Sequence, residues 1–272
     1  MEPLALGVIV PGDDPVASFD KVRSLGLPTC QIMAPPQPWR TPERVRQIQD
    51  ALAERQITIT SMFCHFPGEV YTDIPTIQRV VGLVPRGTRE ERVRMAVGIS
   101  DHARDLGLDT IAAHIGFVPD DHSDPEYHAL VGVMQRLCDH CAGNRQRFAL
   151  ETGQETAPAL LRFIQDVGRE NLGVNFDPAN MLLYGSGEPI EALGLLGRYV
   201  LGAHAKDGTW PARPGELGEE KPLGEGQVGI DRYVAKLKEI GYTGAITIER
   251  EISGPQQIED IRRAIRLLES LR

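Results

Sequence analysis

The chain has 272 residues, of which 41% are hydrophobic, and its formal net charge is −9 at pH 7. This length suits one α/β barrel of about 250 residues better than two domains, so we expect a single domain over residues 1–272. The acidic charge disfavours binding to nucleic acid, which needs a basic stripe, and no apolar run approaches the roughly 18 residues of a membrane span.

The arginine-rich segment 86–96 is interrupted by Glu90 and Glu91 and is interpreted as a solvent-exposed helix face. The apolar start of the chain lacks the basic region of a signal peptide, and a few unpaired cysteines fit a reducing compartment. We therefore expect a cytoplasmic protein with no membrane association.

Strand-like and helical segments alternate along the whole chain. The expected strands cover residues 4–10, 27–33, 57–64, 110–116, 147–152, 172–177, 200–205 and 244–250. The expected helices cover residues 15–25, 42–55, 88–106, 124–142, 156–168, 188–197, 230–240 and 255–271. Eight βα units predict an α/β fold of the (β/α)₈ TIM-barrel type. A doubly wound sheet is disfavoured, because VPGDDPVAS after the first strand lacks the GxGxxG spacing.

Two long loops are expected at the C-terminal face of this barrel, at about residues 66–87 and 208–229. Loops of this length in a compact domain are usually functional or disordered. The second contains PLGEGQVG, whose glycines at 224, 226 and 229 offer backbone N–H groups to a phosphate. Several glutamates crowd the same loop, so we favour a substrate without a phosphate.

Four ligand-type residues end the last four expected strands, in the contexts FALETG, GVNFDPAN, LGAHAKDG and AITIERE. They are Glu151, Asp177, His204 and Glu249. Parallel strands bring these ends to one face, and carboxylates held close together repel one another without a cation. We therefore predict a site for one divalent metal ion, with Mn²⁺ as first choice and Mg²⁺, Co²⁺ or Zn²⁺ as alternatives.

The motifs ALETG, NFDPAN, HAKDG, PLGEGQVGID and ITIERE, in this order, resemble the xylose isomerase-like TIM-barrel superfamily of sugar (phosphate) isomerases and epimerases. The resemblance to its ketose 3-epimerases implies that Glu151 and Glu249 hold metal and form the acid/base pair, while Asp177 and His204 hold metal only. Relatives often form dimers or tetramers, so a homo-oligomer is also expected.

One position departs from this resemblance. Many relatives carry histidine three residues after the strand-six aspartate, where this chain has Asn180. Asparagine donates hydrogen bonds but does not carry a proton, which disfavours a mechanism that needs this histidine. It also disfavours the related trinuclear-zinc DNA repair endonucleases, which use additional histidines.

The predicted function is that of a metal-dependent isomerase or epimerase of carbohydrate metabolism, acting on a small sugar or keto-polyol. A metal bound to a carbonyl stabilises the enediolate that forms when the neighbouring proton is removed. Side chains expected to bind the substrate are His65, His114, Asn180 and Lys206. Two alternatives stay open: a dehydratase of an inosose-like keto-polyol, and a non-catalytic sugar-binding relative.

Overall fold

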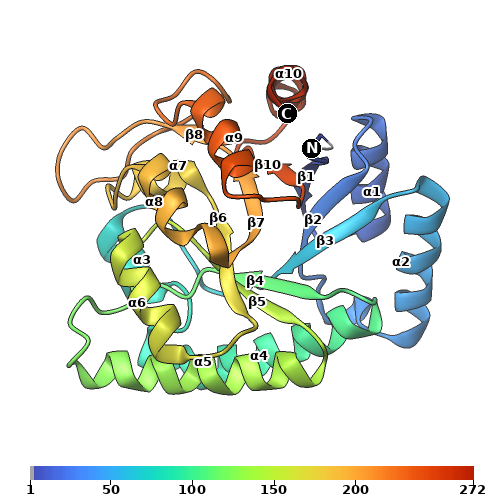
Figure 1. Cartoon of the computed structure of the whole chain (residues 1–272). Coiled ribbons are helices and arrows are strands. Elements are labelled where there is room, and N and C mark those ends of the chain that lie inside the picture. The colour runs from blue at the N-terminus through green and yellow to red at the C-terminus, as the bar shows by residue number, and fades with distance from the viewer. Residues whose placement is uncertain (1–2) are drawn as a thin grey trace.

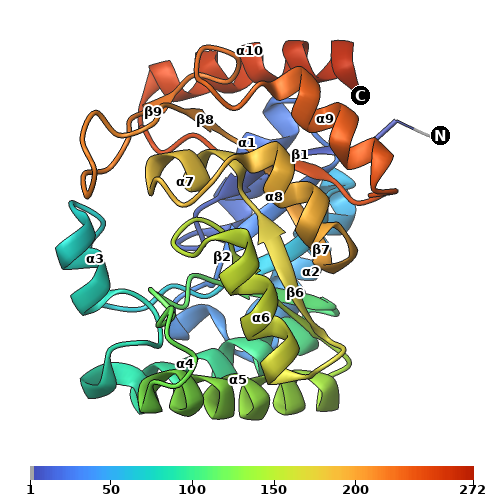
Figure 2. The ribbon, with the colours of Figure 1, turned by 60° about the vertical axis from the view of Figure 1, so that its left-hand side comes forward.

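The computed structural model describes residues 3–272, which form a closed barrel of eight parallel strands surrounded by helices (Figures 1 and 2). In spatial order the barrel strands are β1 (Leu6–Val10), β10 (Ile246–Ile248), β7 (Val200–Ala205), β6 (Leu172–Phe176), β5 (Arg147–Glu151), β4 (Thr110–Ala113), β3 (Thr58–Phe63) and β2 (Thr29–Met33). All eight expected strands are present at the predicted places, and the predicted (β/α)₈ TIM barrel is confirmed.

The eight expected helices are also present and cover the outside of the barrel. They are α1 (Pro15–Ser24), α2 (Pro42–Arg55), α4 (Arg86–Asp105), α5 (Pro125–Gly143), α6 (Ala157–Val167), α8 (Pro189–Leu196), α9 (Ile230–Glu239) and α10 (Pro255–Leu271). Their starts follow the sequence: the Thr41 hydroxyl accepts the Arg44 N–H at 3.3 Å, and proline takes the first position of α2.

Several short elements were not predicted. They are the helices α3 (Ile74–Val80) and α7 (Pro178–Leu183), the 3₁₀ turns Gln37–Trp39 and Gly197–Tyr199, and the antiparallel pair β8 (Asp207–Gly208) and β9 (Glu220–Lys221). Helix α3 lies in the loop after β3, and the β8–β9 pair lies in the loop after β7. Both project from the same end of the barrel (Figure 2).

Two buried arginines and the half-buried Glu69 hold the base of the loop after β3. The Glu69 carboxylate accepts the Gly82 N–H at 2.8 Å, and Arg92 donates to the carbonyls of Gly82 and Pro67 at 2.7 and 3.3 Å. Arg89 Nε donates to the carbonyl of Leu83 at 2.7 Å. The prediction that residues 86–96 form a solvent-exposed helix face is therefore wrong for both arginines, which are buried because they satisfy loop carbonyls.

The apolar core fills the space between the strands and the surrounding helices, and a small second cluster of Phe63, Ala112 and Ala149 is separate from it. The Phe63 ring stacks on the His204 ring with centroids 5.6 Å apart, which places this cluster beside the C-terminal end of β7. Among the described residues, no helix is long and apolar enough to cross a membrane.

Candidate metal centre and its cavity

The four ligand-type residues that end strands β5, β6, β7 and β10 converge at the C-terminal mouth of the barrel. Glu151 is the last residue of β5, Asp177 directly follows β6, His204 lies in β7 and Glu249 directly follows β10. One ligand atom from each lies within 4.8 Å of all the others. Parallel strands of similar length produce this convergence, because they bring equivalent ends to one height.

The imidazole of His204 lies at the centre of the three carboxylates. Its Nδ1 is 3.1 Å from Glu151 Oε1, 3.3 Å from Glu249 Oε2 and 3.4 Å from Asp177 Oδ2. A divalent metal binds nitrogen and oxygen at about 2.0–2.2 Å, which holds neighbouring ligand atoms about 3 Å apart. These spacings and the donor set of three carboxylates and one imidazole fit one divalent ion, with positions left open for a substrate.

A chain of buried amides orients two of these side chains. Gln31 Oε1 lies 2.6 Å from His204 Nε2 and can only accept, so Nε2 carries the proton and Nδ1 is the nitrogen free for a metal. Gln31 Nε2 donates to Asn175 Oδ1 at 2.9 Å, and Asn175 Nδ2 donates to Glu151 Oε2 at 2.6 Å. Hydrogen bonds of this kind fix both the tautomer and the direction of a metal ligand.

Sequence reasoning did not single out Gln31 or Asn175. Both lie inside predicted strands, in the contexts LPTCQIM and LGVNFD, and both are buried in the structure. A buried amide in the middle of an apolar strand needs partners, so these interruptions were the signal that could have found them.

The pKa values of Glu151, Glu249 and His204 are shifted from their ordinary values. Burial raises the pKa of Glu151 to about 7 against the opposing effect of His204. Burial also disfavours ionised Glu249, but Lys206 and His204 outweigh it and hold the Glu249 pKa well below its usual range. Burial lowers the pKa of His204 less than Glu151 and Glu249 raise it, so it stands well above its ordinary value. The carboxylates of Glu151 and Glu249 therefore favour a positive charge at the position of His204 Nδ1.

Lys206 places a buried positive charge behind the residues that line the mouth of the barrel. Its Nζ lies 2.5 Å from Glu251 Oε1, 3.1 Å from Glu249 Oε2 and 3.1 Å from Asn180 Oδ1. Burial opposes its charge, but Glu249 and Glu251 outweigh burial and keep the pKa well above the usual lysine value. Asn180 is held from a second side, because its N–H donates to Asp177 Oδ1 at 2.9 Å.

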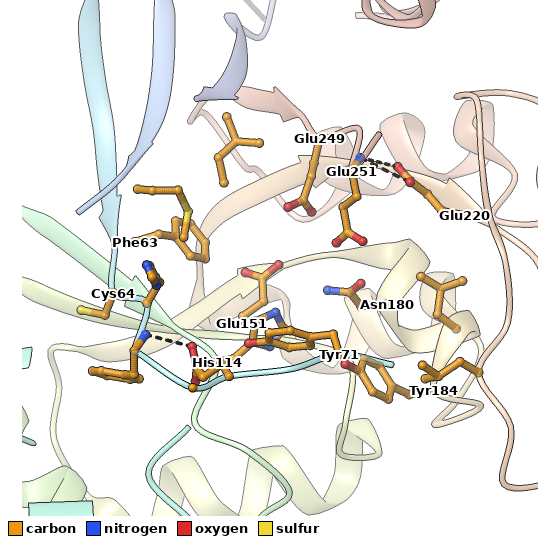
Figure 3. A pocket seen from close by; sticks show the side chains of 18 of the residues that line it. Phe63, Cys64, Tyr71, His114, Glu151, Asn180, Tyr184, Glu220, Glu249 and Glu251 are labelled. Atoms are coloured by element: carbon orange, nitrogen blue, oxygen red, sulfur yellow. Dashed lines mark hydrogen bonds between the residues drawn. The ribbon is translucent and has the colours of Figure 1, made fainter. Parts of the chain in front are cut away.

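A cavity of about 550 Å³ opens above these four residues, a volume within the range of small-molecule sites. Figure 3 shows the carboxylates of Glu151 and Glu249 pointing toward one another across it. Of the four residues predicted to bind the substrate, His65, His114 and Asn180 line this cavity, whereas Lys206 lies under its wall and is 1% exposed.

The structure adds aromatic and acidic groups that sequence reasoning had missed. Tyr71, Tyr184 and Glu251 also line the cavity. Tyr71 comes from the loop after β3 and its ring lies 5.8 Å from the ring of His114. Burial lowers the pKa of His114 to about 4, and its Nδ1 has no hydrogen-bond partner among residues 3–272. A neutral imidazole with a free nitrogen is suited to a substrate hydroxyl.

Asp207 organises the long loop after β7. Its two carboxylate oxygens accept the backbone N–H groups of Gly208, Gly224, Gly226 and Val228 at 2.9–3.1 Å. A β-carbon at Gly226 would lie 2.2 Å from Asp207 Oδ1, so this approach requires glycine. The PLGEGQVG segment therefore surrounds an aspartate of the chain itself, and the N–H groups of Gly224 and Gly226 are not free for a substrate phosphate.

Comparisons with known proteins agree with this geometry. The profile of the family described as "Xylose isomerase-like TIM barrel" matches residues 19–271. The chain is similar to a xylose isomerase domain protein from Planctomyces limnophilus, with a TM-score of 0.96, 45% identity and coverage of 99% of this chain and 98% of that one.

Two enzymes share the fold at lower identity. D-psicose 3-epimerase from Clostridium cellulolyticum H10, solved with D-tagatose, has a TM-score of 0.75 at 16% identity and covers 98% of this chain and 99% of its own. A probable 3-DHS dehydratase from Bacillus anthracis has a TM-score of 0.71 at 16% identity and covers 97% and 98%. At such identities the likeness shows the fold alone.

Proposed function

Because this chain belongs to the xylose isomerase-like TIM-barrel family, we propose that it is a divalent-metal-dependent sugar isomerase or epimerase. The reaction would move a proton on a carbon beside a carbonyl, through an enediolate. The observation that carries this proposal is the convergence of Glu151, Asp177, His204 and Glu249 within 4.8 Å, directly below a cavity that the two glutamates line.

In this proposal Glu151, Asp177, His204 and Glu249 hold the metal, with Mn²⁺ as first choice. When bound, a divalent ion polarises the substrate carbonyl and stabilises negative charge on its oxygen. The rest of the chemistry belongs to the protein. His204 is held by Gln31 with Nδ1 toward the site, and Asp177 is held by the N–H of Asn180.

Glu151 and Glu249 form the acid/base pair in this proposal. Their carboxylates point toward one another at the cavity that both line, so one can remove a proton from a substrate carbon and the other can return a proton to it (Figure 3). They differ in their surroundings: Glu151 Oε2 accepts a hydrogen bond from Asn175 and the side chain is 1% exposed, whereas the Glu249 side chain is 17% exposed. When two carboxyl groups have different environments, one is suited to donate a proton and the other to accept one.

The remaining roles follow from position. His65, His114 and Asn180 line the cavity and would bind hydroxyl groups of a small sugar or keto-polyol. Lys206 would act as a positioning residue, because it contacts Asn180 and Glu249 without reaching the cavity. The expectations of a cytoplasmic location and of a homo-oligomer belong to the same proposal.

The test is proton exchange in D₂O with the manganese-loaded protein and a panel of ketoses. Isomerisation or epimerisation washes deuterium into the carbon beside the carbonyl, and Glu151→Gln or Glu249→Gln should each abolish this signal. Glu225→Gln, on the exposed part of the loop after β7, is the matched control and should exchange at the wild-type rate. Exchange at the wild-type rate in either site variant would show that the residue is not the base.

A dehydratase on the same scaffold is the second candidate. Dehydration begins with the same proton removal but needs another acid beside the leaving hydroxyl. Glu251 lines the cavity with a side chain that is 59% exposed, and it would take that role through Oε2, because its Oε1 is paired with Lys206 Nζ. Loss of one water from the product, seen by mass spectrometry, would replace the isomerase proposal with this one.

A further inference from the structure

A second cavity of about 460 Å³ adjoins the cavity above the metal ligands. Residues from the loops after β1, β2 and β3 line it, together with one face of α4. His65 and Pro67 line both cavities, so the two share one wall at the mouth of the barrel. None of the proposed catalytic or metal-holding residues takes part in this second cavity.

Arg40 gives this second cavity a strong hydrogen-bond donor. Its Nε donates to the carbonyl of Pro35 at 2.8 Å, and its guanidinium lies against α4, where a β-carbon at Gly98 would be 4.0 Å from Nη1. The side chain is half-buried, and burial lowers its pKa. Within residues 3–272 the Nη groups have neither an ion pair nor a hydrogen-bond acceptor. These Nη groups are not among the buried unpaired atoms and reach solvent, so a ligand that supplies oxygens can accept hydrogen bonds from them.

The other polar groups of the second cavity are of mixed charge. Arg94 lies on the same wall, Asp13 and Glu91 supply carboxylates, and Gln37 supplies an exposed amide. The part of the chain that the structure describes contains no ion pair among Arg40, Arg94, Asp13 and Glu91. Two cations and two anions give no net charge, which disfavours a phosphate or carboxylate as the ligand. Hydroxyl groups both donate and accept, so they match a set of separate donors and acceptors.

We infer that the substrate has two parts: a keto-sugar unit above Glu151 and Glu249, and a second hydroxyl-bearing unit, such as a linked sugar, in the cavity lined by Arg40 and Arg94. This inference rests on the proposed function for the position of the first unit. The second unit raises affinity through hydrogen bonds with Arg40, Arg94 and the neighbouring carboxylates.

The experiment compares binding of D-fructose, isomaltulose and D-fructose 6-phosphate to the manganese-loaded protein by calorimetry. Isomaltulose is fructose with a glucosyl group on its 6-hydroxyl, so its carbonyl end is unchanged. Two or three additional hydrogen bonds predict that isomaltulose binds about tenfold more tightly than fructose. Arg40→Met should remove this advantage and leave the affinity for fructose unchanged.

Two further variants show whether the effect of Arg40→Met comes from a folding defect. Arg94→Met changes an exposed side chain and should remove part of the same advantage. Arg44→Met is the matched control, since Arg44 lies over the Trp39 ring outside the cavity and should leave both affinities unchanged.

Equal affinities for fructose and isomaltulose, or no binding of isomaltulose, would overturn the inference. So would tightest binding of fructose 6-phosphate that is lost in Arg40→Met, because this would indicate an anion site. Proton exchange in D₂O is measured on the same samples. A tenfold preference for isomaltulose without exchange would contradict the proposed chemistry and leave the two-part substrate standing.

Discussion

Replacing Gln31 with methionine should weaken metal binding although Gln31 is not a ligand. Methionine has a similar length but leaves His204 Nε2–H and Asn175 Oδ1 without their partners, which lie 2.6 and 2.9 Å from the Gln31 amide. Each unsatisfied buried group costs about 1–3 kcal/mol. We therefore expect the free energy of unfolding to fall by about 2–6 kcal/mol in urea titrations.

The expected effect on the metal site is a separate quantity. Loss of a residue that orients a ligand typically lowers metal affinity about 10–100-fold, which corresponds to about 1.4–2.8 kcal/mol. Calorimetric titration of Mn²⁺ into the metal-free protein measures it. Gln146→Met is the matched control, because Gln146 is equally buried but binds Ser100 and the carbonyl of Leu108. An unchanged Mn²⁺ affinity in Gln31→Met, or an equal loss in Gln146→Met, would refute the orienting role.

Three other substitutions test the charges around the mouth. Lys206→Met should lower the free energy of unfolding of the metal-free protein by about 3–5 kcal/mol in urea, because Glu249 and its neighbours lose their buried cation. Asp207→Asn should speed hydrogen exchange of the amides at residues 224, 226 and 228, because these N–H groups lose a charged acceptor. Glu155, buried and hydrogen-bonded to the Val118 N–H, has its pKa raised to about 7 by burial. The folded chain therefore holds this proton more tightly, and stability falls as pH rises from about 4.5 to 7. Glu155→Gln should remove up to about 3 kcal/mol of that fall.

Each of these expectations has a contradicting result. A wild-type urea midpoint for Lys206→Met would mean that the carboxylates do not need this cation. Unchanged exchange at residues 224–228 in Asp207→Asn would show that other contacts hold the loop. If the stability difference between Glu155→Gln and wild type were the same at pH 5 and pH 8, ionisation of this carboxyl would not limit stability.

The barrel and the convergence of its four ligand-type residues were predictable because both follow from local patterns. Apolar strands ending at Glu151, Asp177, His204 and Glu249 need only the rule that parallel strands present their ends to one face. The short helix α7 was not predicted, because Asp177 and Pro178, where it begins, also fit the end of a strand.

The surroundings of the ligands depend on contacts between distant segments, and a single sequence does not reveal these. Gln31 and Asn175 lie 144 residues apart and meet only when the barrel closes. The position of Lys206 under the wall depends in the same way on Glu251, which sits on a different strand end. Arg89 and Arg92 were read as solvent-exposed, because their partners are carbonyls of a loop whose path the sequence does not fix.

The most direct test of the metal centre is the anomalous difference density of a crystal grown with Mn²⁺. We expect one peak at the barrel mouth, about 2.1 Å from His204 Nδ1 and from one oxygen of each of Glu151, Asp177 and Glu249. His204 Nε2 should remain hydrogen-bonded to Gln31. A peak bound through Nε2, a peak elsewhere on the protein, or no peak at saturating Mn²⁺ would contradict it.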